Sequence, residues 1–165
     1  MTTMISPAPV RRTVTVEASP QKAFDIFTAR FDRWWPSAYQ IGATPMKSAV
    51  IEPKAGGRWY EVGEDGAECQ WGDVLAWEPP SRIVLAWRIR TALHAAWRFD
   101  PDLLTEVEVT FTPVGDGTTR VELEHRLLEN LGEAGEAARA VFDSEHGWAG
   151  ILQAFAQEAR SVPMA

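Results

Sequence analysis

The chain has 165 residues, of which 45% are hydrophobic and 24% are charged, and its formal net charge is −7. This composition is typical of one globular domain, and it contains no basic run that could neutralise a nucleic-acid backbone. We therefore expect no nucleic-acid partner. No segment approaches the roughly 20 apolar residues that cross a bilayer, so we also expect no membrane partner and a cytoplasmic protein.

The beginning of the chain predicts a short leader and a first strand. Residues 1–9 carry prolines and small polar side chains, which are typical of a disordered leader. Residues 10–17 alternate between apolar and polar side chains, which predicts a strand. No repeat or linker interrupts the rest of the chain, so we expect one domain over residues 10–162.

Two short helices are predicted directly after this strand. Ser19 supplies a capping hydroxyl and Pro20 suits the first helical position, so the first helix begins there. A second helical segment over residues 29–35 ends before Pro36, because a proline disfavours the helical conformation in the residue that precedes it.

Further strands are predicted from alternating stretches that turn residues separate. They cover residues 46–52, 58–62, 68–77, 82–90, 105–113 and 118–126. The last two form the clearest hairpin, because Gly115-Asp116-Gly117 lies between two stretches of clean alternation. Their apolar side chains share one face with His125 and their glutamates share the other, so the sheet has a dry face and a wet face.

The end of the chain predicts one long amphipathic helix over residues 144–160. Trp148, Ile151 and Phe155 recur there at helical spacing and form an apolar stripe. This helix is the only long element available to cover the dry face of the sheet. Residues 134–141 are predicted either as a preceding helical turn or as a mobile lid.

Eight tryptophans are spread over nearly all of these predicted elements. They are Trp34, Trp35, Trp59, Trp71, Trp77, Trp87, Trp97 and Trp148. Because an indole is large and rigid, several converging indoles are expected to pack poorly in a dry interior and to line a pocket instead. The adjacent pair Trp34 and Trp35 is expected to place one ring inward and the other on the surface.

Short motifs in a fixed order extend over roughly residues 10–160. They are Ser19-Pro20, Trp34-Trp35, Gly56-Gly57-Arg58-Trp59, Trp71-Gly72-Asp73-Val74, Glu78-Pro79-Pro80-Ser81-Arg82, Trp87, Thr105-Glu106-Val107, residues 119–125 and Gly147-Trp148. This set resembles the helix-grip fold of the START-related superfamily (SRPBCC), in the branch of the heat-shock-protein-90 ATPase activator C-terminal domain. The resemblance implies an α+β fold in which a curved antiparallel sheet of six or seven strands grips a long C-terminal helix. It also implies a cavity for a hydrophobic small molecule, and a link to the stress response.

The side chains expected to face that cavity are the candidate ligand-binding residues. They are Phe27, Phe31, Trp35, Trp59, Trp71, Trp87, His125, Trp148, Ile151 and Phe155. Burial of apolar ligand area against such walls contributes about 25 cal/mol per Å². We therefore expect a protein that binds or sequesters a small apolar or aromatic molecule, and we favour this over an enzyme.

His125 has two interpretations, because an imidazole on the dry face needs a hydrogen-bond partner there. It is either a satisfied core histidine, or a ligand contact and general acid/base. Beside Glu61 or Asp73, it would form the catalytic pair of a cyclase-like or hydratase-like enzyme. A chaperone or regulatory partner and a homodimer stay open as further alternatives.

The residues that most often bind metals or cofactors are sparse. Cys69 is the only cysteine, and it is expected to be a small strand residue rather than a nucleophile. No two histidines or cysteines stand at metal-site spacing, so no metal is expected. Gly56-Gly57 does not follow a strand into a helix, as a phosphate-binding loop would, and no cofactor is expected.

Overall fold

The structure, a computed structural model, describes residues 8–36, 44–90, 98–145 and 147–161. One strand and two short helices come first: β1 (Val10–Val16), α1 (Pro20–Thr28) and α2 (Phe31–Trp34). Ser19 caps α1 by accepting a hydrogen bond from the backbone N–H of Lys22 at 3.2 Å, with Pro20 at the first helical position. The predicted start of this helix is therefore confirmed.

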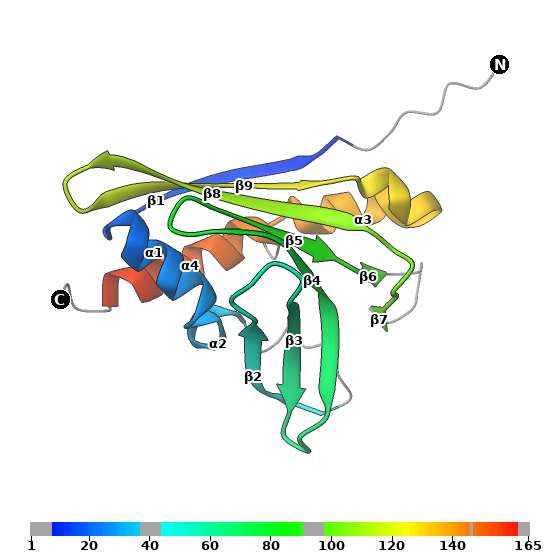
Figure 1. Ribbon diagram of the computed structural model, residues 1–165. Coiled ribbons are helices and arrows are strands. Elements are labelled where there is room, and N and C mark those ends of the chain that lie inside the picture. The colour runs from blue at the N-terminus through cyan, green and yellow to red at the C-terminus, as the bar shows by residue number, and fades with distance from the viewer. Residues whose placement is uncertain (1–7, 37–43, 91–97, 146, 162–165) are drawn as a thin grey trace.

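A seven-stranded antiparallel sheet forms the body of the molecule, in the order β1-β9-β8-β5-β4-β3-β2. Besides β1, its strands are β2 (Met46–Ile51), β3 (Arg58–Gly63), β4 (Glu68–Glu78), β5 (Arg82–Trp87), β8 (Thr105–Gly115) and β9 (Thr118–Arg126). Figure 1 shows β1, β8 and β9 running side by side, while β2, β3 and β4 turn away from them. The sheet is therefore strongly curved.

The β8–β9 hairpin has the two faces that its alternation predicts. On the dry face, Val107, Val109 and Phe111 of β8 are buried, as are Val121, Leu123 and His125 of β9. On the wet face, Arg126 bridges Glu106 and Glu108, with nitrogen–oxygen distances of 2.9 Å to each carboxylate. Burial of one face and ion pairing on the other fix the register of this hairpin.

The chain ends in a 3₁₀ helix and two α-helices. They are η2 (Leu128–Ala134), α3 (Gly135–Phe142) and α4 (Trp148–Ser161). The segment predicted as a helical turn or a mobile lid is thus helical. Helix α4 packs on α1, α2 and β1, and its buried stripe includes Trp148, Ile151 and Phe155. This arrangement of a curved sheet around a C-terminal helix is the predicted helix-grip fold (Figure 1).

Two local predictions need correction. The strand predicted over residues 82–90 is two strands, because Arg88 separates β5 from the short β6 (Ile89–Arg90), which pairs with β7 (Arg98–Phe99). The expectation that one ring of Trp34-Trp35 is exposed is wrong, because both side chains are buried. The N–H of Trp34 donates to the Ile26 carbonyl oxygen at 2.9 Å, which holds that ring against α1.

The predicted leader over residues 1–9 and the domain limits of 10–162 stay predictions. Residues 1–7 and 162–165 lie outside the described residues. Trp97, one of the eight tryptophans, also lies outside them.

Candidate functional site

Five buried tryptophans form a closed circuit of ring contacts between the sheet and α4. These five, which we call the tryptophan cluster, are Trp35, Trp59, Trp71, Trp87 and Trp148. Each ring lies beside two others of the set, with centroids 5.2 to 5.9 Å apart in tilted or edge-to-face orientations. Aromatic pairs favour these orientations. The expectation that converging indoles pack poorly in a dry interior is therefore wrong for these five.

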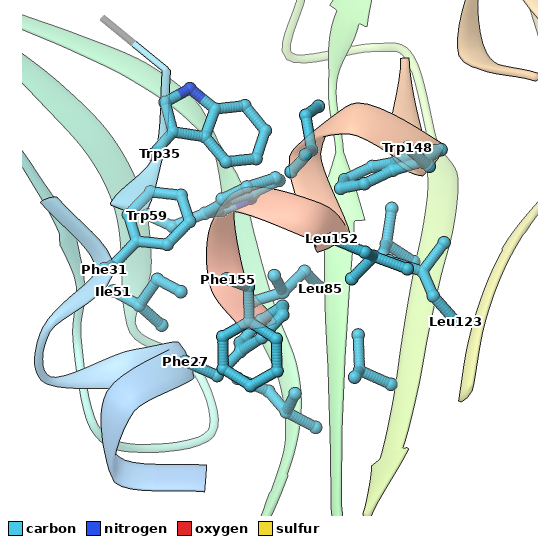
Figure 2. Close-up of a cluster of buried hydrophobic side chains, with 14 of the residues drawn as sticks. Phe27, Phe31, Trp35, Ile51, Trp59, Leu85, Leu123, Trp148, Leu152 and Phe155 are labelled. Carbon is cyan, nitrogen blue, oxygen red and sulfur yellow. The ribbon is translucent and has the colours of Figure 1, made fainter. Parts of the chain in front are cut away.

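The members of the tryptophan cluster come from three strands, from the residue after α2 and from the start of α4. Trp59, Trp71 and Trp87 lie on the neighbouring strands β3, β4 and β5, whereas Trp35 follows α2 and Trp148 begins α4. Figure 2 shows Trp35 and Trp59 on one side of the α4 ribbon and Trp148 on the other. The cluster therefore exists only when sheet, short helices and terminal helix are all in place.

Gly72 makes room for one of these indoles. It lies opposite Trp59 in the β3–β4 pair, next to an irregularity in the register. The N–H of Trp59 donates across β4 to the Ala86 carbonyl oxygen at 2.7 Å. A Cβ atom at position 72 would overlap that carbonyl oxygen and lie 2.7 Å from the Trp59 nitrogen, so only glycine permits this hydrogen bond.

All ten predicted ligand-binding residues are buried in one continuous interior. Besides the tryptophan cluster they are Phe27, Phe31, His125, Ile151 and Phe155. Phe31 contacts Trp35 with a centroid distance of 5.1 Å, and Phe27 contacts Phe155 at 5.3 Å. The structure therefore brings together the residues that the sequence singled out, and their contact with a ligand stays a prediction.

His125 stands at the centre of a hydrogen-bonded chain. Its Nδ1 accepts the indole N–H of Trp148 at 3.1 Å, and its Nε2 lies 2.9 Å from the Thr105 hydroxyl oxygen. Because an indole nitrogen can only donate, Nδ1 carries no proton and the imidazole proton lies on Nε2. Nε2 therefore donates to Thr105, whose hydroxyl donates in turn to the Trp87 carbonyl oxygen at 2.8 Å.

Burial controls the charge of His125. The ring is fully buried and packs against Phe142 with a centroid distance of 4.5 Å. Burial lowers the pKa of His125 from its ordinary value of 6.5 to about 3, because the interior disfavours the charged imidazolium. At neutral pH the imidazole is uncharged and both of its nitrogens have partners, as in the core interpretation of this residue.

The two candidate carboxylates have partners of their own. Glu61 is fully buried on β3, and its Oε1 accepts the indole N–H of Trp71 at 3.0 Å. Asp73 is half-buried on β4 and forms an ion pair with Arg88, with 2.7 Å between Oδ2 and Nε. Since both nitrogens of His125 are already hydrogen-bonded, neither carboxylate forms the predicted pair with it in this arrangement.

Comparison with known protein families assigns the chain to one family. The family model described as activator of Hsp90 ATPase homolog 1-like protein matches residues 17–160. The chain belongs to this family. The match extends from the end of β1 to the last turn of α4, so it covers every element that contributes to the tryptophan cluster. A comparison with curated proteins gives no match.

Solved structures similar to this family member include two that share more than 30% of its sequence. The anthrahydroquino-γ-pyrone synthase Txn09 complexed with SUM is 37% identical, with a TM-score of 0.63; the match covers 92% of this chain and 97% of that one. The self-sacrificing resistance protein CalC from Micromonospora echinospora is 34% identical, with a TM-score of 0.67, and the match covers 92% and 93% of the two chains. The Aha1 dimer from Colwellia psychrerythraea is 15% identical, with a TM-score of 0.63 and coverage of 94% and 98%, which shows the fold alone.

Sequence reasoning missed Thr105 and Phe142, the close neighbours of His125. A signal for Thr105 was present, because a polar residue begins an otherwise apolar alternating face. In the sheet Thr105 pairs with Trp87, and His125 pairs with Val107, two residues along the same face. Phe142 gave no such signal, since its contact depends on how α3 folds back onto the sheet.

Sequence reasoning also missed a groove of about 590 Å³ beside α1. Its walls are mainly apolar side chains from α1 and from the ends of β2 and β4, with three polar side chains from α1. The lining residues are Gln21, Phe24, Asp25, Thr28, Ala29, Ile51, Pro53, Trp77, Pro79 and Pro80. None of the ten candidate ligand-binding residues lines this groove.

Among the residues that the structure describes, no three His, Cys, Asp or Glu side chains gather where they could hold a metal ion. Cys69 is half-buried on β4, and burial raises the pKa of its thiol, with the nearby charge of Glu61 adding to the shift. No helix in the described part of the chain is long and apolar enough to span a bilayer.

Proposed function

We propose that this protein binds a small, largely apolar aromatic molecule between the sheet and α4, with the tryptophan cluster as its main contact surface. The observation that carries the proposal is the closed circuit of five indoles, which three strands, the residue after α2 and the start of α4 supply. Leucine or phenylalanine fills a core without an N–H group that needs an acceptor. Indoles offer flat faces and polar edges, which suit a flat aromatic guest.

The related structures support this proposal. One relative above 30% identity is a synthase complexed with a ligand, and its name describes a fused aromatic product. The other is a resistance protein. Both align with more than nine-tenths of this chain and share its fold.

A ligand in this interior has to separate rings that contact one another in the described structure. Binding therefore changes the surroundings of several indoles at once, and tryptophan emission reports it. Naphthalene, a flat apolar probe, is expected to quench or shift this emission. At a hundred times its Kd it should stabilise the fold by about 2.7 kcal/mol, which corresponds to roughly 5–10 °C in melting temperature. An unchanged emission and melting temperature at saturation would end the proposal.

Catalysis of a cyclase-like or hydratase-like reaction is the second candidate, and the 37% identity with a synthase favours it. His125 would then position groups through its hydrogen bonds, because its low pKa removes it as a proton carrier near neutrality. The probe is ring closure of 2′-hydroxychalcone to flavanone, an isomerisation in which the phenol oxygen adds to the enone. Catalysis predicts a rate above the protein-free background that His125→Ala removes while naphthalene still binds. A rate equal to background would argue against this candidate.

The remaining expectations stay predictions. A homodimer and a chaperone or regulatory partner rest on the family name and on a dimeric neighbour that is 15% identical. The cytoplasmic location and a link to the stress response likewise rest on the sequence and the family resemblance.

A further inference from the structure

The five indole N–H groups of the tryptophan cluster differ in whether they have an acceptor. Trp59 donates to the Ala86 carbonyl oxygen, Trp71 to Glu61 and Trp148 to His125. The indole nitrogens of Trp35 and Trp87 are buried, and no hydrogen-bond acceptor for either lies among the described residues. Folded proteins seldom leave a buried donor unpaired, because each one forfeits the hydrogen bond that it made to water.

These two donors flank the same neighbour. The centroids of Trp35 and Trp87 lie 5.9 Å and 5.6 Å from that of Trp148, one ring on each side of it in the circuit. Phe31 contacts Trp35 with a centroid distance of 5.1 Å, and it also lies 5.7 Å from Trp71 and 6.2 Å from Trp59. Figure 2 shows the nitrogen edge of Trp35 turned away from Phe31. The unpaired donors therefore belong to the two rings that flank Trp148, and the donor of Trp35 points away from Phe31.

Two polar side chains near Trp87, those of His125 and Thr105, already have partners. His125 accepts from Trp148 and donates to Thr105, and the Thr105 hydroxyl donates to the Trp87 carbonyl oxygen. This chain of hydrogen bonds leaves no unused acceptor on His125. A guest that contacts Trp35 and Trp87, on the two sides of Trp148, thus meets two N–H donors that need acceptors.

We infer that the ligand is a flat aromatic molecule with carbonyl or ring-oxygen acceptors, which the N–H groups of Trp35 and Trp87 bind. This inference rests on the proposed function and narrows its ligand class. A hydrocarbon of equal size gains the ring contacts but leaves both donors unpaired. A ligand whose only polar groups are donors meets two further donors, which cannot pair with it.

Chromone and naphthalene are the matched probes for this inference. Both are flat bicycles of nearly equal size, but chromone has a carbonyl and a ring oxygen and no donor. The readout is the ratio of their Kd values, measured by calorimetry on the full chain, because the ratio cancels the loss of ring area in a variant. Each of Trp35→Phe and Trp87→Phe is expected to shift this ratio against chromone by about three- to tenfold, the worth of one neutral hydrogen bond.

Trp77→Phe is the control variant. Trp77 contacts Phe24 with a centroid distance of 5.0 Å and lines the groove beside α1, outside the tryptophan cluster. This substitution removes the same atoms but should leave the ratio unchanged. Nitrogen-15 spectra of the unaltered protein provide a measurement that needs no variant. Chromone is expected to move two indole N–H resonances downfield, and naphthalene is not.

The outcomes separate this inference from the proposed function. If naphthalene binds but the ratio is the same in the unaltered protein and in both Phe variants, the inference is wrong and the proposed function stands. If neither probe binds, both are wrong. If the variants do not fold, the spectra decide, and the absence of downfield shifts with bound chromone would overturn the inference. A crystal structure with bound chromone in which both indole N–H groups donate only to water would overturn it as well.

Discussion

The two ends of the interior are built from different aromatic residues. At one end lies the phenylalanine cluster, which consists of Phe24, Phe27, Phe111 and Phe155, with ring centroids 5.2 to 5.8 Å apart. At the other end lies the tryptophan cluster, at similar spacing. Figure 2 shows Phe27 and Phe155 at one end of the close-up and Trp35 and Trp148 at the other.

The two ends differ in their hydrogen-bonding groups and not in the spacing of their rings. The phenylalanine cluster has no side-chain donor or acceptor, so packing alone determines its arrangement. The tryptophan cluster has five N–H groups, and three of them use a backbone carbonyl, a buried carboxylate and a buried imidazole. Such an arrangement needs supporting residues at fixed positions, and it leaves two donors for a guest. The first end is thus held by ring packing alone, whereas the second also depends on hydrogen bonds.

The largest expected effect comes from Gly72→Ala, which disrupts the backbone packing at the tryptophan end. Gly72→Ala places a Cβ atom against the Ala86 carbonyl oxygen and the Trp59 nitrogen, both of which are held in the sheet. We expect a loss of more than about 4 kcal/mol in the free energy of unfolding, or an insoluble protein. Gly115→Ala is the control, because its nearest atom, Thr118 Cβ, would be 3.9 Å away. Urea denaturation measures both, and wild-type stability for Gly72→Ala would contradict the close approach.

A second substitution breaks the phenylalanine end. Phe155→Ala removes a fully buried ring that contacts Phe27, with a centroid distance of 5.3 Å. We expect a loss of about 3–5 kcal/mol in the free energy of unfolding, because a cavity remains where the ring was. Since no N–H group is involved, the ratio of chromone to naphthalene affinity should not change. A cost below about 1 kcal/mol would show that this end is loosely packed.

The buried imidazole makes the tryptophan end sensitive to acid. The pKa of His125 is about 3 in the folded protein and near 6.5 when unfolded, so only the unfolded chain takes up a proton between these values. The contribution of the uncharged His125 to the free energy of unfolding is fully present above pH 6.5. It falls by about 1.4 kcal/mol per pH unit below pH 6.5, until pH 3 is reached. Denaturation midpoints at pH 7 and pH 5 measure the slope.

His125→Gln is the control for this slope, because glutamine can still accept from Trp148 and donate to Thr105 but does not titrate. The variant should lose most of the dependence between pH 6.5 and pH 5. An equal slope in both proteins would mean that His125 takes up its proton without unfolding.

The hairpin and the start of α1 could be predicted because their signals are local. Strict alternation around Gly115-Asp116-Gly117 predicted which side chains of β8 and β9 are buried, including His125. The partners of His125 could not be predicted in the same way. Thr105 lies 20 residues before it and Trp148 lies 23 residues after it. Their contacts depend on the strand register and on the position of α4, and no short window of sequence encodes either.

The tryptophans show the same limit. Spacing predicted that Trp87 and Trp148 face the interior, and both do. The burial of both Trp34 and Trp35 was not predicted, because the chain becomes extended at Trp35 immediately after α2 and so does not follow helical spacing. Which indoles have acceptors depends on positions such as Ala86 and Glu61, on other strands. The burial of the candidate residues was therefore predictable, whereas their hydrogen bonds were not.

The smallest expected effect is the difference in stability cost between two substitutions within the tryptophan cluster. Trp59→Phe and Trp87→Phe remove the same atoms from two buried indoles, so the loss of ring area is similar in both. Trp59→Phe also leaves the Ala86 carbonyl oxygen without the N–H that it accepts at 2.7 Å, whereas Trp87→Phe removes a donor that has no acceptor in the described structure. Without ligand, Trp59→Phe should therefore cost about 1–2 kcal/mol more free energy of unfolding. Equal costs would mean that the Trp87 N–H is already satisfied in the free protein, and the distinction between used and unused donors would then disappear.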